Sequence, residues 1–157
     1  MLKFTNQYFW HFVWWLLFVV WLIMAVIILD TESRVAPTAV SIGEWGLLVL
    51  AIWRAGRLVS GDVTTKWFRE QFYDLKKVGK GMALEKPKSG PRRAILDIIT
   101  SPWSLSLWLG SLLTFCFLLS EYFFYPLLFL ALSGGVGFLE ALLGFLQKNS
   151  ARDDWGD

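Results

Sequence analysis

The most constraining feature of the chain is an apolar run near its start. Residues 9–29, FWHFVWWLLFVVWLIMAVIIL, contain a single polar side chain, that of His11. A helix rises 1.5 Å per residue, so about 20 apolar residues cover the roughly 30 Å hydrocarbon layer of a bilayer. The run is too long for the apolar part of a signal peptide, and no small-residue cleavage site precedes Asp30. We therefore expect a retained first membrane span.

The second apolar segment, about residues 40–59, is the weakest candidate span. Glu44 lies near its start, and Arg54 and Arg57 lie near its end. Arginine side chains are long enough to reach the headgroups from inside a span, so these charges do not exclude a membrane position. We predict a second transmembrane helix here.

Two more apolar segments complete the predicted fold. Transmembrane helices are expected over about 103–119 and 125–146, joined by the short turn SEYFFYP. The composition agrees, because a chain of 157 residues with 55% hydrophobic and 18% charged residues has too few polar groups to cover a soluble domain. The predicted fold class is an all-α integral membrane protein, a single four-span domain over residues 1–157.

The long polar segment, residues 61–99, sets the expected orientation. It carries nine of the 15 lysines and arginines, whereas the connection after the first span carries only Arg34 and SEYFFYP carries none. Basic loops stay in the cytoplasm, so this loop, both termini and a flexible tail over 147–157 are expected there. Apolar residues recur with helical spacing over about 64–78, which predicts an amphipathic helix on the bilayer surface. Its lipid-interface residues are expected to be Lys66, Trp67, Phe68, Phe72, Lys76 and Lys77.

Small residues form stripes on the third and fourth predicted spans. Such stripes let helix backbones approach closely in lipid. Because the turn between these spans is short, we predict that the two helices pack as a tight hairpin; oligomerisation through the same stripes is the alternative. The predicted packing residues are Ser106, Gly110 and Thr114 on the third span and Ser133, Gly137, Ala141 and Gly144 on the fourth.

Glu140 would lie about two turns inside the cytoplasmic end of the fourth span. A carboxylate at that depth costs several kcal/mol unless it is paired, protonated or hydrated. Arg54 and Arg57 come at a similar depth on the same side. We expect a buried or interfacial charge pair, with Glu140–Arg54 as the preferred pairing; a carboxylate that handles protons or ions is the alternative.

The first span also carries an aromatic stripe, formed by Trp10, Trp14, Phe18 and Trp21. Such a stripe is expected to face lipid, and a pigment or quinone site is the alternative. His11 is interpreted as an interfacial residue, because no second metal ligand is near it in the sequence. Cys116, the single cysteine, is interpreted as a small apolar filler. The sequence predicts no catalytic residues, no cofactor and no metal site.

Two segments, WRAGRLVSGDVTTKWFREQF and ILDIITSPWSLSLW, carry a family resemblance. Over about residues 48–139 the chain resembles the small bacterial and phage membrane proteins known as domain of unknown function 1360. The matching positions are Arg57, Leu58, Asp62, Thr65, Arg69, Thr100, Pro102 and Trp108. Two cysteines of the family motif are Ser101 and Ser104 here, so no cysteine pair can act in redox or metal chemistry. We expect Ser101 and Pro102 to begin the third span, with the serine hydroxyl capping free N–H groups.

These observations favour a non-enzymatic accessory or assembly component of the bacterial inner membrane. Helix packing and the basic loop would carry its function, and anionic lipid headgroups, other membrane proteins or a second copy would be its partners. Nucleic acid is not expected as a partner, since acidic residues are interleaved with the basic ones. The alternative is a holin-like or channel-like oligomeric pore. No nucleophile–base pair or phosphate-binding glycine loop supports an enzyme.

Overall fold

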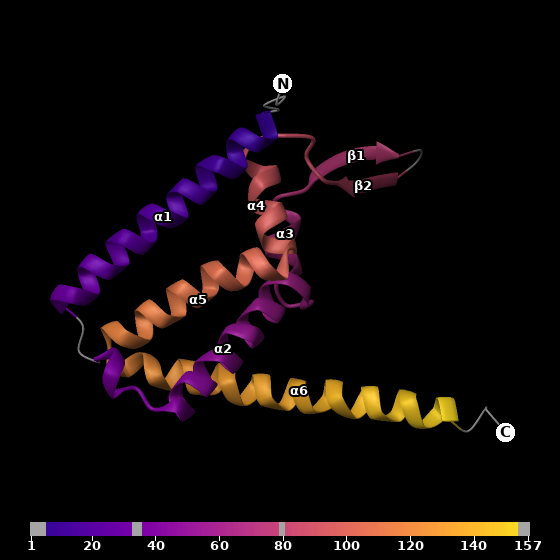
Figure 1. Ribbon diagram of the computed structural model, residues 1–157. Helices are drawn as coiled ribbons and strands as arrows, with labels where there is room; N and C mark the ends of the chain where they lie inside the picture. Colours follow the sequence, from indigo (N-terminus) through magenta and orange to yellow (C-terminus); the bar gives the residue numbers. More distant parts are fainter. Residues whose placement is uncertain (1–5, 33–35, 79–80, 154–157) are drawn as a thin grey trace.

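The structure is a computed structural model that describes residues 6–32, 36–78 and 81–153. The described chain is mostly helical, with one two-stranded antiparallel sheet (Figure 1). The elements in chain order are α1 (Asn6–Glu32), η1 (Pro37–Ala39), α2 (Ile42–Gly61), α3 (Lys66–Glu70), β1 (Asp74–Val78), β2 (Gly81–Glu85), α4 (Pro91–Thr100), α5 (Pro102–Leu119), η2 (Glu121–Phe123) and α6 (Phe124–Asp153). Helix α6 continues to Asp153, past the predicted end of the fourth span, and residues 154–157 of the predicted tail lie outside the described residues.

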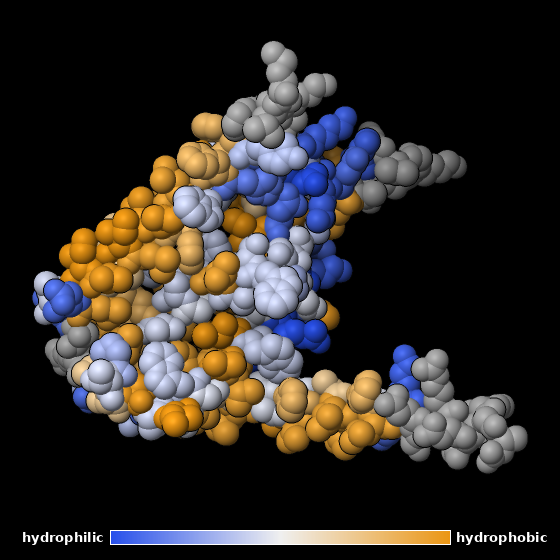
Figure 2. All heavy atoms as spheres, in the orientation of Figure 1, coloured by the Kyte–Doolittle hydropathy of each residue, from blue (hydrophilic) through white to orange (hydrophobic). Residues whose placement is uncertain are grey.

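Three helical stretches are long and apolar enough to cross a membrane: Gln7–Glu32, Pro102–Leu119 and Glu121–Lys148. They correspond to the first, third and fourth predicted spans. Large apolar side chains stay exposed along them, including Val26 at 66% and Phe129 at 75%. Figure 2 shows the resulting hydrophobic surface along α1 and α6. An apolar surface of this extent is typical of a membrane protein.

Helix α2 forms the centre of the helix packing. Its buried residues Leu48 and Ala51 pack with Phe117 and Leu118 of α5 on one side. On the other side they pack with α6, whose buried residues are Leu127 and Ala131. Helices α5 and α6 make few direct contacts with each other, so the predicted tight hairpin of the third and fourth spans is wrong. Each of these helices instead packs on α2.

Hydrogen-bonded caps fix where α2 and α5 begin. The Ser41 hydroxyl accepts from the Glu44 backbone N–H at 3.3 Å, and the Glu44 carboxylate accepts from the Ser41 N–H at 2.7 Å. This reciprocal capping box accounts for a charged residue at the start of an apolar helix. At α5, Ser101 accepts from the Ser104 N–H at 3.5 Å and Pro102 occupies the first turn. The cap predicted for the third span is confirmed.

The segment predicted as an amphipathic helix over 64–78 is a short helix followed by a strand. Helix α3 ends at Glu70, and Asp74–Val78 pairs antiparallel with Gly81–Glu85. The predicted all-α fold is therefore wrong at this hairpin. Phe68 and Phe72 do meet, with ring centroids 5.4 Å apart, but Leu75 is 71% exposed on β1. The register places a two-residue connection containing a glycine after Val78, which favours a hairpin over a continued helix.

Several connections between the helices lie at two opposite sides of the molecule. Figure 1 shows the start of α1, the β1–β2 hairpin and the start of α4 at one side. The end of α1, η1 and η2 lie at the other side. The last part of α6 extends away from the other helices, and its side chains Leu142, Leu143 and Leu146 are exposed. Chain segments between long helices thus alternate between the two sides.

Candidate functional site

A polar cluster joins the start of α1 to α4. The Asp97 carboxylate accepts hydrogen bonds from the Arg93 Nε at 3.2 and 3.3 Å and from the Gln7 Nε2 at 3.4 Å. His11 Nε2 lies 3.6 Å from the Asp97 Oδ2. Arg93 also donates to the Pro87 carbonyl at 3.0 Å, which ties the cluster to the segment before α4. The four side chains therefore hold two distant parts of the sequence together.

His11 lies close to both Gln7 and Asp97 in this cluster. The Gln7 amide nitrogen lies 3.1 Å from the His11 Nε2. His11 was predicted to be an interfacial residue, with no second metal ligand near it in the sequence. Its Nε2 atom lies 3.6 Å from the carboxylate of Asp97, which is distant in the sequence.

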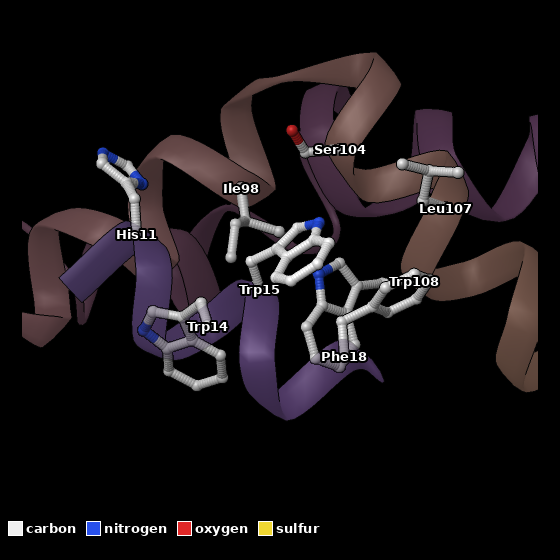
Figure 3. Close-up of a pocket in the computed structure, with 8 residues that line it drawn as sticks. All are labelled: His11, Trp14, Trp15, Phe18, Ile98, Ser104, Leu107 and Trp108. Carbon is white, nitrogen blue, oxygen red and sulfur yellow. The ribbon is translucent and has the colours of Figure 1, made fainter. Parts of the chain in front are cut away.

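A pocket of about 190 Å³ adjoins this cluster between α1, α4 and α5. Figure 3 shows the rings of Trp15, Phe18 and Trp108 gathered between α1 and α5. The pocket is lined by His11, Trp14, Trp15, Phe18, Ile98, Ser104, Leu107 and Trp108. Its wall is thus mainly aromatic, and His11 links it to the polar cluster.

The aromatic stripe of α1 packs against α5 and does not simply face lipid as predicted. Trp108 lies edge-on to Phe18 with ring centroids 5.0 Å apart and to Trp14 at 6.2 Å. Trp21 donates from its Nε1 to the Ser111 hydroxyl at 3.2 Å and meets Phe115 at 5.2 Å. Large rings fill the space between two helices with specific edge-to-face contacts. The fourth member of the stripe, Trp10, contacts the ring of its neighbour in sequence, Phe9.

A second constellation is formed by four positions that carried the family resemblance: Leu58, Asp62, Thr65 and Arg69. The Thr65 hydroxyl donates to the Leu58 carbonyl and lies 3.3 Å from the Asp62 carbonyl. Arg69 donates to the Val59 carbonyl at 3.0 Å and to the Thr65 hydroxyl at 3.1 Å. The last carbonyls of a helix lack partners within it, so these side chains act together as the C-terminal cap of α2.

Other family positions lie at the junction of α4 and α5 or within α5, and Asp62 lies at the end of α2. Asp62 caps α2, and its carboxylate accepts from the Thr64 N–H at 3.1 Å. Hydrogen bonding from the Thr64 backbone lowers the pKa of the Asp62 carboxyl. Thr100 donates to the Leu96 carbonyl at 2.8 Å, just before Pro102. With Trp108 in the pocket wall, these positions serve helix ends and packing.

The predicted charge pair between Arg54 and Glu140 is not formed. Both residues lie in described parts of the chain, and no ion pair within 4 Å joins them. Arg54 lies in the α2–α6 contact beside Gly137, and its buried Nε has no hydrogen-bond partner among the described residues. Glu140 and Arg57 are exposed.

Some of the predicted small residues of α5 and α6 pack against α2, and most of the others are exposed. Gly110 lies beside Ile52, and Gly137 lies beside Trp53. Gly134 was not predicted, yet a Cβ atom there would lie 2.8 Å from the Leu50 carbonyl oxygen. The sequence signal that could have identified Gly134 is its position three residues after another small residue, Ala131, which is buried in the structure. The other predicted positions, apart from the half-buried Thr114, are exposed: Ser106, Ser133, Ala141 and Gly144.

The predicted lipid-interface residues lie on α3, the following turn and β1. Trp67 is 65% exposed, and Phe68 and Phe72 contact each other. Lys66 pairs with Glu70 at 3.6 Å, and Lys76 pairs with Glu85 at 2.7 Å across the hairpin. The Lys76 ammonium lowers the pKa of the Glu85 carboxyl. Lys77 lies on β1.

Replacing Asp97 by alanine is expected to lower the free energy of unfolding by about 1–2 kcal/mol. Arg93 would lose its carboxylate acceptor, and Gln7 of α1 would lose its hydrogen bond to α4. An SDS titration of the protein in mild detergent measures the change. Asp74→Ala is the matched control, because its pair with Arg92 is about half exposed and is worth about 0–1 kcal/mol. Equal effects of the two substitutions would contradict the role given to the cluster.

Among the described residues, no group of three or more His, Cys, Asp or Glu side chains is arranged to hold a metal ion. Ser104 lines the same pocket as His11, but no hydrogen bond joins these two described residues. The pocket wall offers mainly aromatic and apolar surfaces, with His11 and Ser104 as polar members. The fold and the site together define a helical membrane protein with three candidate spans.

A family model described as a protein of unknown function (DUF1360) matches residues 47–143. The chain belongs to this family, as its sequence resemblance predicted. Neither the search of curated proteins nor the search of solved structures found a match.

Proposed function

We propose that the chain is a four-span protein of the bacterial inner membrane that acts without catalysis, as an accessory or assembly component. Helix contacts within the membrane and a basic segment on the cytoplasmic side would carry this function. The observation that supports it best is the position of α2 between two candidate spans, with the lysine-rich segment directly after it.

The case for α2 as a fourth span rests on its contacts. Its own sequence is less apolar than the other three because it contains Glu44, Arg54 and Arg57. Its core residues pack on α5 and α6, both of which are candidate spans. A helix of 20 residues, which is long enough to cross the hydrocarbon layer, then lies between two helices that are candidate spans. Glu44 is satisfied by its capping box, and the arginines lie near the opposite end.

The basic segment supports the proposed orientation and the proposed partner. It lies at the same side of the molecule as the start of α1 (Figure 1). Lys86 and Lys88 in this segment are exposed, and so is Arg57 near the end of α2. Each basic residue near an anionic surface contributes about 1 kcal/mol of attraction. Anionic headgroups of the cytoplasmic leaflet are therefore the proposed lipid partners, and both termini would be cytoplasmic.

Cysteine labelling in intact bacterial spheroplasts tests this proposal. The native Cys116 is first replaced by serine, and single cysteines are introduced as Thr38→Cys in η1 and Ser89→Cys before α4, both at exposed positions. With a membrane-impermeant maleimide, we expect Thr38→Cys to react at once and Ser89→Cys to react only after permeabilisation. This pattern requires the two positions to lie on opposite sides of an intact membrane.

The same experiment separates the accessory role from a pore. Reaction at Ser89→Cys together with entry of an impermeant dye would indicate a pore and would contradict the accessory role. Reaction at Ser89→Cys without dye entry would show that the orientation is wrong. If neither cysteine reacts until the membrane is permeabilised, the four-span arrangement is excluded.

A further inference from the structure

The last part of α6 is an exposed apolar helix that carries one acidic side chain. Every residue from Phe138 to Lys148 is exposed, and Figure 1 shows this part of α6 extending away from the other helices. Glu140 lies about two turns before Lys148, where the candidate span ends. A carboxylate at that depth in lipid is costly unless it is paired, protonated or hydrated. The end of α6 therefore favours a partner that supplies a cation.

Helices α2 and α6 run in the same direction where they pack. A Cβ atom on Gly134 would lie against the Leu50 carbonyl, and further along both helices a Cβ atom on Gly137 would lie 3.9 Å from the Arg54 Nη1. Beyond these contacts the two helices diverge (Figure 1). A residue one turn after Gly137 and a residue one turn after Arg54 therefore lie beyond the same contact and at a similar distance from it.

Two opposite charges occupy these positions. Glu140 comes three residues after Gly137, and Arg57 comes three residues after Arg54. Both side chains are exposed, and neither forms an ion pair with a described residue. A two-fold axis along the membrane normal keeps two copies in the same orientation and makes each contact occur twice. With such an axis beside the end of α6, Glu140 of each copy would meet Arg57 of the other.

We propose that the chain forms a symmetric dimer in the membrane through the exposed end of α6, with Glu140 of each copy paired to Arg57 of the other. Charge complementarity favours a second copy as the partner, because this chain itself carries the cation at the matching position. Ala141 and Gly144 are exposed beside Glu140, and residues of this size let a second helix approach closely. The proposal rests on the membrane position proposed above for α2 and α6, and it names the partner that their contacts engage.

Förster transfer between donor-labelled and acceptor-labelled copies in phosphatidylcholine vesicles tests the dimer. The labels are attached at Ser89→Cys after Cys116 has been replaced by serine. With the native charges, transfer should rise with protein density and saturate. Glu140→Arg alone and Arg57→Glu alone should each raise the dissociation constant by about tenfold or more, because like charges then face each other across the interface. Glu121→Arg is the matched control, since it reverses an exposed carboxylate at the opposite end of the same candidate span and should leave transfer unchanged.

Mixing the two single variants decides whether the pair forms between copies. A dimer of either variant with itself contains two like-charge contacts. A mixed dimer of Glu140→Arg with Arg57→Glu contains two opposite-charge contacts, so transfer from a Glu140→Arg donor to an Arg57→Glu acceptor should return to the native level. A charge pair within one chain cannot be restored by mixing. The absence of recovery in the mixture would therefore overturn the proposal.

Two other results would also overturn it. One is transfer by the native charges that does not exceed random proximity in the vesicles, a comparison that decides the question even if a variant fails to fold. The other is native-level transfer by Glu140→Arg alone, which would assign the dimer to another surface. The labelling of Thr38→Cys and Ser89→Cys in spheroplasts tests the spans separately. A chain with the expected orientation and no dimer would contradict this proposal and leave the proposed arrangement of spans intact.

Discussion

Gly134→Ala is expected to lower the free energy of unfolding by about 1–3 kcal/mol. The added Cβ atom would lie 2.8 Å from the Leu50 carbonyl oxygen and 3.2 Å from the Arg54 Cβ. The nearest obstacle is backbone, which cannot rotate away as a flexible side chain can, so α2 and α6 must separate. Loss of packing outweighs the helix propensity of alanine, which favours it over glycine by about 1 kcal/mol. SDS titration in mild detergent, followed by circular dichroism, measures the difference.

The neighbouring glycine supplies the control. A Cβ atom on Gly135 would meet nothing within 4 Å. Gly135→Ala should therefore leave stability unchanged or raise it by up to about 1 kcal/mol through helix propensity. Both variants change a glycine of α6 into alanine and differ only in the helix face that they occupy. If the two variants unfold at the same detergent concentration, the close approach of α6 to α2 does not exist.

The difference between these two glycines also explains what the sequence could and could not predict. A small residue indicates that some backbone can come close, but it does not identify which helix will do so. The stripe through Gly137 and Gly144 pointed to a neighbour, and chain connectivity suggested α5. In the structure α2 lies between the two, because its Leu48 and Ala51 complete a core with both. The three long apolar helices were predictable from length and composition alone, since each is set by its own residues.

The polar cluster could not be predicted, because its members come from two helices that are far apart in the sequence. Within α4, Arg93 and Asp97 are four residues apart, and within α1, Gln7 and His11 are four apart, so each pair was visible as neighbours on a helix face. Their meeting depends on how α1 packs against α4, which no local pattern encodes. The hairpin was missed for the opposite reason. The spacing of Phe68, Phe72 and Leu75 fits a helix, but α3 ends at Glu70 and the glycine-containing connection after β1 favours strand pairing.

Arg69→Met is expected to lower the free energy of unfolding by about 1.5–3 kcal/mol, the usual worth of hydrogen bonds from a charged donor. The substitution keeps a long apolar stem and removes the guanidinium that donates to the Val59 carbonyl and the Thr65 hydroxyl. The Val59 carbonyl in the last turn of α2 then loses the donor that Arg69 supplies, at the point where the chain passes from α2 to α3. Lys66→Met is the matched control: its 3.6 Å pair with Glu70 is exposed, and such a pair contributes about 0.5 kcal/mol or less.

A double-mutant cycle with Thr65→Val decides whether the cap acts as a unit. The Thr65 hydroxyl accepts from Arg69 and donates to the Leu58 carbonyl, so it transmits the effect of either substitution to the helix end. Residues in one hydrogen-bond network show coupling of about 0.5–3 kcal/mol, so the double variant should be less destabilised than the sum of the two single variants. Strict additivity would mean that Arg69 and Thr65 stabilise α2 independently, and these family positions would then not form a single cap.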